Sequence, residues 1–273
     1  MDTAGNISNR AWEATLQGRF QDALHIYNVE LVEELAQYDQ LGPPGHLGNQ
    51  AILFTLMGHL DAALEMSRQI RSRQHTTAYP VPLIGAILWM QGKRTEACDD
   101  WAFEIERRRS GVITHCDEAG GVEVPALLWW ASAHTGFEGQ RKLAEQELKR
   151  RGRTKRCQTS RWPGPLVPYL LGQSSENKPY DELLLNNAAA FSERYPNINF
   201  RYECLAHFHV GTAHLARGDT QEYLAQLKQV VAAKSTDVPA GAPPMLDSVD
   251  ALRLCNPEYH LARAELRSAR EQQ

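Results

Sequence analysis

The chain has 273 residues, which is enough for a continuous hydrophobic core. Its composition is 42% hydrophobic and 23% charged, with a net charge of −4, which excludes a disordered chain and does not point to nucleic acid or membrane. No apolar run is long enough to span a bilayer, so a membrane protein is not expected.

The cysteines and the first residues indicate the compartment. The five cysteines are scattered, odd in number and without a C-x-x-C pair, so we expect free thiols in a reducing compartment. Residues 1–14 have no basic segment followed by an apolar one, which argues against a signal peptide. Together these features predict a cytoplasmic protein.

The charges are unevenly distributed along the chain. Residues 1–40 contain seven acids and two bases, whereas residues 141–161 contain nine bases and two acids. Asymmetry of this kind indicates a polar partner surface more than a feature of the fold.

Four related heptads define the organisation of the chain. They read GRFQDAL at residues 18–24, GHLDAAL at 58–64, GKRTEAC at 92–98 and, less closely, GDTQEYL at 218–224. Each follows one apolar helical stretch and begins another, and after Gly18 the apolar residues recur with the 3.6-residue period of an amphipathic helix. Because glycine tolerates the left-handed conformation that closes a helix, each heptad predicts a turn between two helices.

Small residues recur at fixed distances from the turn glycines. Seven residues before the turn glycines stand Ala11, Ala51, Gly85 and Gly211. Five residues after the turn glycines of the first three heptads stand Ala23, Ala63 and Ala97. Paired helices that cross closely need a small side chain at the contact, so these positions predict helix hairpins. A degenerate further hairpin is expected to turn at Gly136.

This small–x₆–Gly–x₄–Ala–apolar pattern resembles the tetratricopeptide repeat (TPR) superfamily. The resemblance covers residues 1–110 and 200–234 well and residues 120–150 loosely. The chain departs from the family in lacking the proline that usually ends the second helix, and several linkers are long. The resemblance implies an all-α, TPR-like helix-hairpin solenoid with irregular linkers and a C-terminal capping helix.

The predicted domains form one continuous solenoid. Residues 1–151 hold the N-terminal repeats, 152–200 a proline-rich connector with short helices near 166–171 and 181–195, and 201–273 a further repeat and the capping helix. Residues 238–244 read as a loop. Asn256 is the expected N-cap of a solvated last helix, with Pro257 at its first position.

No motif for catalysis, cofactor or metal is evident, so we expect no enzyme, no catalytic residue and no cofactor. Cys204, His207, His209 and His214 are the best metal-ligand candidates, but one helix does not bring them into a tetrahedral set. The acidic loop DEAGGVEVP at 117–125 is the most enzyme-like segment, although a helix-linking loop with a few solvated carboxylates is the preferred interpretation. His115 beside Cys116 matches a catalytic pair only in composition.

The basic run KRRGRTKRCQTSR at 149–161 has three possible interpretations. It could contact the phosphates of a nucleic acid, or an acidic protein patch, or it could be a solvated helix end, where cations are favourable. It lacks interleaved aromatic residues until Trp162, which argues against nucleic acid.

In TPR-like proteins the first helix of each hairpin lines a concave groove, which is the predicted partner-binding site. Counting back from the turn glycines and adding nearby aromatic and acidic side chains selects Asn9, Trp12, Thr15, Asn49, Ile52, Thr55, Trp89, Trp130, Glu123 and His209. The alternative is that the tryptophans pack between helices. Tyr79 and Leu83 stand where a co-chaperone that clamps a C-terminal carboxylate would need bases.

The sequence therefore favours a non-catalytic protein-binding function, without a metal, a membrane or a homo-oligomer being indicated. The segments GNQAILFTLMG, GAILWMQGKRTEACDDW, DEAGGVEVPALLWW and RWPGPLVPYLLG resemble a group of bacterial TPR-like proteins encoded beside secreted toxins. That resemblance implies a cytosolic immunity protein that occludes its cognate toxin. The alternatives are a scaffold, adaptor or peptide-sensing protein and, less favoured, a nucleic-acid binder or an enzyme.

Overall fold

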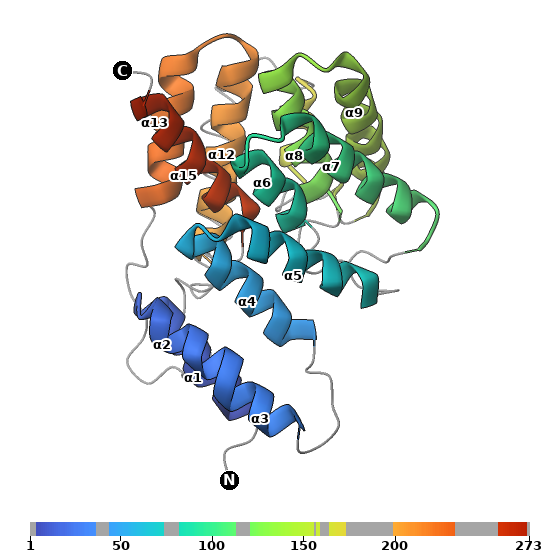
Figure 1. Ribbon diagram of the computed structural model, residues 1–273. Coiled ribbons are helices and arrows are strands. Elements are labelled where there is room, and N and C mark those ends of the chain that lie inside the picture. Colours follow the sequence, from blue (N-terminus) through green and yellow to red (C-terminus); the bar gives the residue numbers. More distant parts are fainter. Residues whose placement is uncertain are drawn as a thin grey trace. The chain divides into compact units, whose positions relative to one another are not determined.

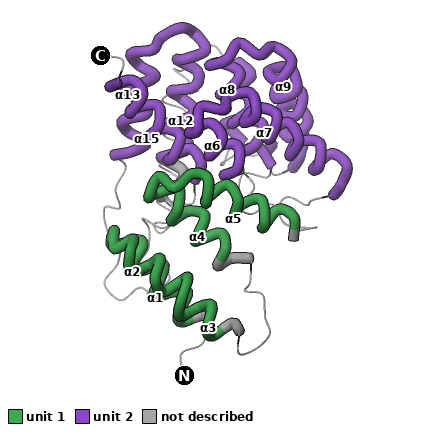
Figure 2. The backbone as a smooth tube through the Cα atoms, in the orientation of Figure 1, with its two compact units in different colours: residues 1–75 green, residues 76–273 purple. Residues whose placement is uncertain are grey.

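The computed structural model describes residues 4–36, 44–73, 82–112, 121–155, 157–158, 164–172, 199–232 and 256–271. The regular elements in these ranges are all helices and no strand occurs among them, which confirms the predicted all-α class. No helix in the same ranges is long and apolar enough to cross a membrane. The chain divides into two compact units, residues 1–75 and 76–273, which are described separately (Figure 2).

Unit 1 is built of packed helices. Its elements are α1 (Ala4–Leu16), α2 (Phe20–His25), the π-helical turn η1 (Ile26–Glu30), α3 (Leu31–Ala36), α4 (Pro44–Met57) and α5 (Leu60–Arg73). α2, η1 and α3 follow one another without a gap, as expected for the amphipathic helix after Gly18. Their buried side chains pack with those of α1 and with Leu53 of α4 in a core of Ile7, Ala11, Ala14, Ala23, Tyr27, Leu31 and Leu53.

Unit 2 continues the hairpin pattern. Its elements are α6 (Pro82–Met90), α7 (Arg94–Arg109), α8 (Glu123–Thr135), α9 (Glu138–Gly152), α10 (Leu166–Leu170), α12 (Asn199–Ala216), α13 (Thr220–Ala232) and α15 (Pro257–Glu271). α6 packs with α7, α8 with α9 and α12 with α13, so each pair is a hairpin (Figure 1). α8 also packs against α7 and α12.

The repeated heptad forms the same turn at each of its occurrences. Gly18 has a φ of +72°, its N–H donates to Thr15 O at 3.1 Å, and the next N–H, of Arg19, donates to Ala14 O at 2.8 Å. This is a Schellman closure, in which the last carbonyls of the first helix accept hydrogen bonds from the turn. The same pair of hydrogen bonds recurs at Gly58, Gly92 and Gly218.

The alanine of the heptad marks the start of the second helix. The carbonyl oxygen of Arg19, directly after the turn glycine, accepts the N–H of Ala23 at 3.0 Å. His59 with Ala63 and Lys93 with Ala97 repeat this contact. One residue therefore ends the Schellman turn and opens the next helix, which explains why glycine and alanine keep a fixed spacing. Gly136, with a φ of +70°, joins α8 to α9 as predicted.

The small positions before the turns are close helix contacts, as predicted. A β-carbon on Gly85 would lie 2.4 Å from the Trp101 ring, and one on Gly211 would lie 3.1 Å from Cβ of Gln226. Ala11 and Ala51, at the equivalent positions of unit 1, are fully buried.

The C-terminal helix begins at Pro257 as predicted, but two other expectations for it are wrong. Residues 257–262 are buried because α15 packs on α6, α12 and α13, so the first half of the helix is not solvated. Asn256 is fully buried, and neither its Oδ1 nor its Nδ2 makes a hydrogen bond with the described residues. Its side chain therefore does not cap the helix, although its backbone oxygen accepts the N–H of Tyr259 at 3.2 Å.

The connector is described only in part. α10 matches the helix expected near 166–171. The helix expected at 181–195 and the loop at 238–244 lie outside the described residues.

Candidate binding surfaces

An aromatic and polar cluster fills the interior of unit 2. The rings of Trp89 and Trp130 lie 4.6 Å apart between centroids, and Trp101 packs against both. The Tyr223 hydroxyl accepts the indole N–H of Trp130 at 3.2 Å and lies 2.9 Å from Nε2 of His134. The cluster therefore joins α6, α7, α8 and α13 through buried contacts.

α15 closes this cluster with one carboxylate. Oε1 of Glu265 accepts the indole N–H of Trp89 at 2.9 Å, and Oε2 lies 3.6 Å from Nε2 of His134. Burial lowers the pKa of His134 below 6.5, although the Glu265 charge opposes this shift. Burial also raises the pKa of Tyr223 well above 10, so both side chains are neutral near pH 7. The arrangement suits a structural network inside the repeats.

The structure places most of the predicted groove residues in the interior. Thr15 and Thr55 are buried and donate to the carbonyls of Ala11 and Ala51 in their own helices. Ile52, Trp89, Trp130, Glu123 and His209 are also buried, with exposed fractions of 7% or less. Trp89 and Trp130 pack between helices, which is the alternative prediction for the tryptophans. A partner would not reach these side chains in this structure.

The accessible members of the predicted set all lie in unit 1. Asn9 is exposed, while Trp12 and Asn49 are half-buried. On α1, positions 9, 12 and 13 share one side of the helix, because residues three and four apart are neighbours on its surface. We call Asn9, Trp12 and the exposed Glu13 the α1 face. Asn49 instead neighbours the buried Tyr27, whose pKa is raised by burial and partly lowered again by Asn49 and Ser8.

Cys204, His207 and His214 of α12 each contact a different partner. Sγ of Cys204 contacts Val230 O at 3.4 Å, Nδ1 of His207 lies 2.8 Å from Oε1 of Gln226, and Nδ1 of His214 lies 3.2 Å from Oδ2 of Asp219. No cluster able to hold a metal occurs among the described residues.

The other residues considered as reactive groups are either buried or outside the described residues. Residues 113–120, including His115, Cys116 and half of the acidic loop, lie outside the described residues, and Glu123 is the first residue of α8. Cys98, Cys157 and Cys204 are free thiols, as predicted for the cysteines. Burial raises the pKa of the Cys98 thiol to about 11, so this sulfur remains protonated and is a poor nucleophile.

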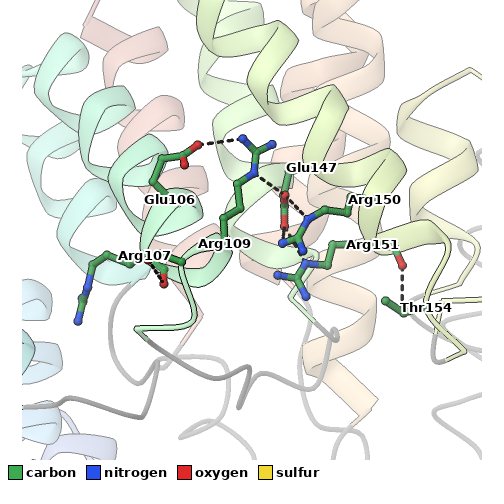
Figure 3. Close-up of polar contacts among 8 residues, drawn as sticks. Glu106, Arg107, Arg109, Glu147, Arg150, Arg151 and Thr154 are labelled. Atoms are coloured by element: carbon green, nitrogen blue, oxygen red, sulfur yellow. Dashed lines mark hydrogen bonds and ion pairs between the residues drawn. The ribbon is translucent and has the colours of Figure 1, made fainter.

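The structure reveals a basic surface where α7 and α9 end side by side (Figure 3). α7 ends in Arg107, Arg108 and Arg109, and α9 ends in Lys149, Arg150 and Arg151. Cations are favourable at both sites because the C-terminus of a helix carries partial negative charge. We define the basic surface as Arg107, Arg109, Lys149, Arg150 and Arg153.

Glu147 holds two arginines of this surface, Arg109 and Arg150, together with the buried Arg151. Its carboxylate, which is 2% exposed, accepts hydrogen bonds from Nε of Arg109 at 3.0 Å, Nε of Arg150 at 2.8 Å and Nε of Arg151 at 2.8 Å. Burial alone would raise the pKa of Glu147, but the hydrogen bonds from Arg150, Arg109 and Arg151 outweigh it and lower the pKa from 4.5 to about 2. Glu147 is therefore an anion at any physiological pH.

The sequence indicates only half of this surface. The run that begins at residue 149 is evident, but the contribution of Arg107–Arg109 is not. A signal is nevertheless present: Arg107 lies 15 residues after the turn glycine Gly92, and Lys149 lies 13 residues after Gly136. Second helices of successive hairpins that run side by side bring such positions together.

Comparison with known proteins does not assign the chain to a family. No protein-family model matches the chain, and no curated protein matches it.

Proposed function

We propose that this chain is a non-catalytic protein-binding protein of the TPR-like kind and that it engages its partner through the α1 face. The observation that carries the proposal is the accessibility of Asn9 and Trp12 beside the exposed Glu13, whereas the other predicted groove residues except Asn49 are buried. An amide that both donates and accepts, next to a partly exposed indole, is a common composition of binding sites.

The arrangement of the hairpins supports this kind of function. Turns of one geometry connect helices that pack tightly, and repeats of this type offer a preformed surface with little enclosed volume for a reaction. A preformed surface loses little conformational entropy on binding, so a tight complex is feasible.

We further propose that the partner is a bacterial toxin domain, which this chain occludes as an immunity protein. The support is the resemblance of its segments to immunity proteins encoded beside toxins, together with the acidic character of residues 1–40. Glu13, Asp22 and Glu33 are exposed in unit 1. Exposed acids suit a toxin whose cleft is basic because it handles RNA or a nucleotide, and they would speed the encounter.

Co-expression in bacteria tests the proposal. The toxin encoded beside this gene should stop growth when expressed alone and should be tolerated when the wild-type chain is present. Glu13→Lys, an exposed charge reversal, should restore killing, and Trp12→Ala should do the same. Glu65→Lys on α5 is the matched control, since Glu65 is also exposed in unit 1, and it should protect like wild type.

Two results would contradict the proposal. Killing that is equal with and without the wild-type chain would exclude the immunity function. Full protection by Glu13→Lys and Trp12→Ala, with both variants folded by circular dichroism, would exclude the α1 face. If a protein other than a toxin co-purifies, the scaffold or adaptor alternative is favoured.

A further inference from the structure

The basic surface carries more positive charge than its own acids neutralise. Residues 104–109 and 147–155 contain eight bases, three in the first range and five in the second, but only three acids, Glu104, Glu106 and Glu147. Glu147 is shared by three arginines, and one carboxylate neutralises one positive charge. The ends of α7 and α9 therefore retain a net positive field.

The accessible cations of this surface are partly preorganised. The side chains of Arg109 and Arg150 are 29% and 48% exposed while both hydrogen-bond to Glu147, and Lys149 and Arg153 are exposed beside them. A guanidinium has five N–H donors, so Arg150, and Arg109 even though it also pairs with Glu106, keep donors that can bind a further carboxylate. Because Glu147 already restricts their rotamers, little side-chain entropy is lost when a partner binds.

A buried cation reinforces the field beneath the surface. Arg151 is 7% exposed, and its Nη2 atom makes no hydrogen bond within the described part of the chain. A buried guanidinium that is incompletely paired favours a nearby negative charge, because the interior screens charge less than water does.

Apolar side chains adjoin the basic surface on α7. The large apolar residues exposed in the described part of the chain are Val29, Val32, Phe103 and Val112, so two of these four belong to α7 or the turn that ends it. Phe103 is 52% exposed, and the Arg107 guanidinium lies 5.8 Å from its ring centroid. Exposed aromatic residues beside arginine are typical of the residues that dominate protein interfaces.

These observations favour a protein over a nucleic acid as the occupant. The side chain of Glu106 is 59% exposed and lies within the surface. Its charge would repel a continuous row of phosphates, whereas the separated carboxylates of a peptide can avoid it. The exposed Val112 offers an aliphatic contact. A nucleic-acid base stacks on aromatic rings and gains little from such a contact.

We infer that the ends of α7 and α9 form a second docking surface, which takes an acidic segment of a partner protein. The carboxylates of the partner segment pair with Arg109, Lys149, Arg150 and Arg153. An apolar side chain of the same segment covers Phe103. This surface is independent of the α1 face in unit 1, and the inference does not require the partner to be a toxin.

Fluorescence anisotropy with the full chain tests this inference. The probes are a labelled peptide of alternating glutamate and leucine, the same peptide with glutamine in place of glutamate, and labelled single-stranded oligouridine. We expect the acidic peptide to bind and the other two probes not to bind, with binding that weakens as salt is raised.

Variants then locate the site. Lys149→Glu combined with Arg153→Glu should weaken binding of the acidic peptide by about tenfold or more, and Phe103→Ala should weaken it by about threefold. Lys228→Glu on α13, at an exposed lysine in the same unit, should change it by less than about twofold. Trp12→Ala should leave it unchanged, which separates this surface from the α1 face.

Four results would overturn the inference. They are no binding of the acidic peptide, binding of the glutamine peptide with equal affinity, binding of oligouridine in preference to the peptide, and equal losses in Lys228→Glu and in the Lys149–Arg153 double variant. Because Lys149, Arg153 and Phe103 are exposed, their variants are expected to fold, and circular dichroism checks this.

Discussion

The indole of Trp101 lies directly on the backbone at Gly85, so close that a β-carbon on Gly85 would stand 2.4 Å from Cε2 of the ring. Trp101 is fully buried, and its ring packs against the rings of Trp89 and Trp130, so it has little space into which to move. The glycine on α6 and the tryptophan on α7 are therefore one unit of packing, and the position seven residues before the turn glycine is small for that reason.

Gly85→Ala should destabilise unit 2 for this reason. The expected loss in the free energy of unfolding is about 2 kcal/mol, within the range for an overpacked core, despite the higher helix propensity of alanine. Gly139→Ala is the control, because Gly139 lies in α9 with nothing within 4 Å of its added β-carbon. Urea unfolding should show the control equal to or more stable than wild type. Equal stability of Gly85→Ala and wild type would contradict the close packing of Trp101 on this glycine.

Gly92→Ala should be destabilising through the backbone instead of through packing. An added β-carbon meets nothing within 4 Å, but the φ of +77° disfavours any residue with a β-carbon. The expected loss is about 1 kcal/mol, and Gly92→Asn should lose less, because asparagine tolerates the left-handed region better. Thermal unfolding should therefore rank glycine above asparagine and asparagine above alanine. The reverse order for the two variants would argue against the Schellman turn.

Glu147→Gln should be the most damaging change in the basic surface. It leaves Arg109, Arg150 and the buried Arg151 facing one another without their shared anion, and breaking a buried ion pair in this way costs about 3 kcal/mol. Glu106→Gln, at a side chain that is 59% exposed and paired with Arg109, should cost less than about 1 kcal/mol. Denaturant unfolding of the two variants compares them directly, and equal losses would contradict the anchoring role.

The lowered pKa of Glu147 predicts that the free energy of unfolding falls at acidic pH. The pKa of Glu147 is about 2 in the folded chain and 4.5 in its ordinary state, so the unfolded chain takes up the proton first as pH falls. The stability that Glu147 contributes to the folded chain is therefore complete above about pH 4.5 and is lost progressively between about pH 4.5 and 2. Glu147→Gln should remove that part of the acid sensitivity.

The sequence predicts the hairpins well because their signal is local. A turn glycine, the alanine that follows it and the small residue that precedes it act within one hairpin, so Gly18, Gly58, Gly92, Gly136 and Gly218 are all recognisable as turn positions from the order of the residues alone. The close contact of Gly85 with Trp101 follows from the same spacing, since residue 85 precedes Gly92 by seven positions and residue 101 follows it by nine.

The candidate surfaces are harder to predict because they depend on contacts between hairpins. Trp89 and Trp130 stand at positions that a regular groove would expose, but α15 returns from the end of the chain and covers Trp89 with Glu265. The spacing of the repeats contains no information about that return. The joining of Arg109 to Glu147 likewise depends on α7 and α9 lying together, and neither segment alone reveals it.

Tyr223→Phe should weaken unit 2 without changing its shape. The hydroxyl of Tyr223 is the shared partner of Trp130 Nε1 and His134 Nε2, and its loss leaves a buried indole N–H without an acceptor. The expected cost is about 1 to 3 kcal/mol. Tyr259→Phe on α15 is a comparison variant at another buried tyrosine. Chemical unfolding followed by tryptophan fluorescence measures both, and a Tyr223→Phe variant as stable as wild type would show that the hydroxyl contributes nothing to the network.

His209 should make the stability of unit 2 fall below neutral pH. Burial lowers its pKa from 6.5 to about 3, and its Nδ1 has no hydrogen-bond partner in the described part of the chain, so the folded state holds the ring neutral. Because the unfolded chain binds the proton first, stability is retained above about pH 6.5 and declines as pH falls toward 3, with a loss of about 2 kcal/mol from His209 alone by pH 5. His209→Leu removes the titrating group and should make unfolding less dependent on pH between 7 and 5, while Cys204→Ala on the same helix should keep the wild-type dependence. Urea midpoints across this range measure the effect, and parallel curves for wild type and His209→Leu would show that another group is responsible.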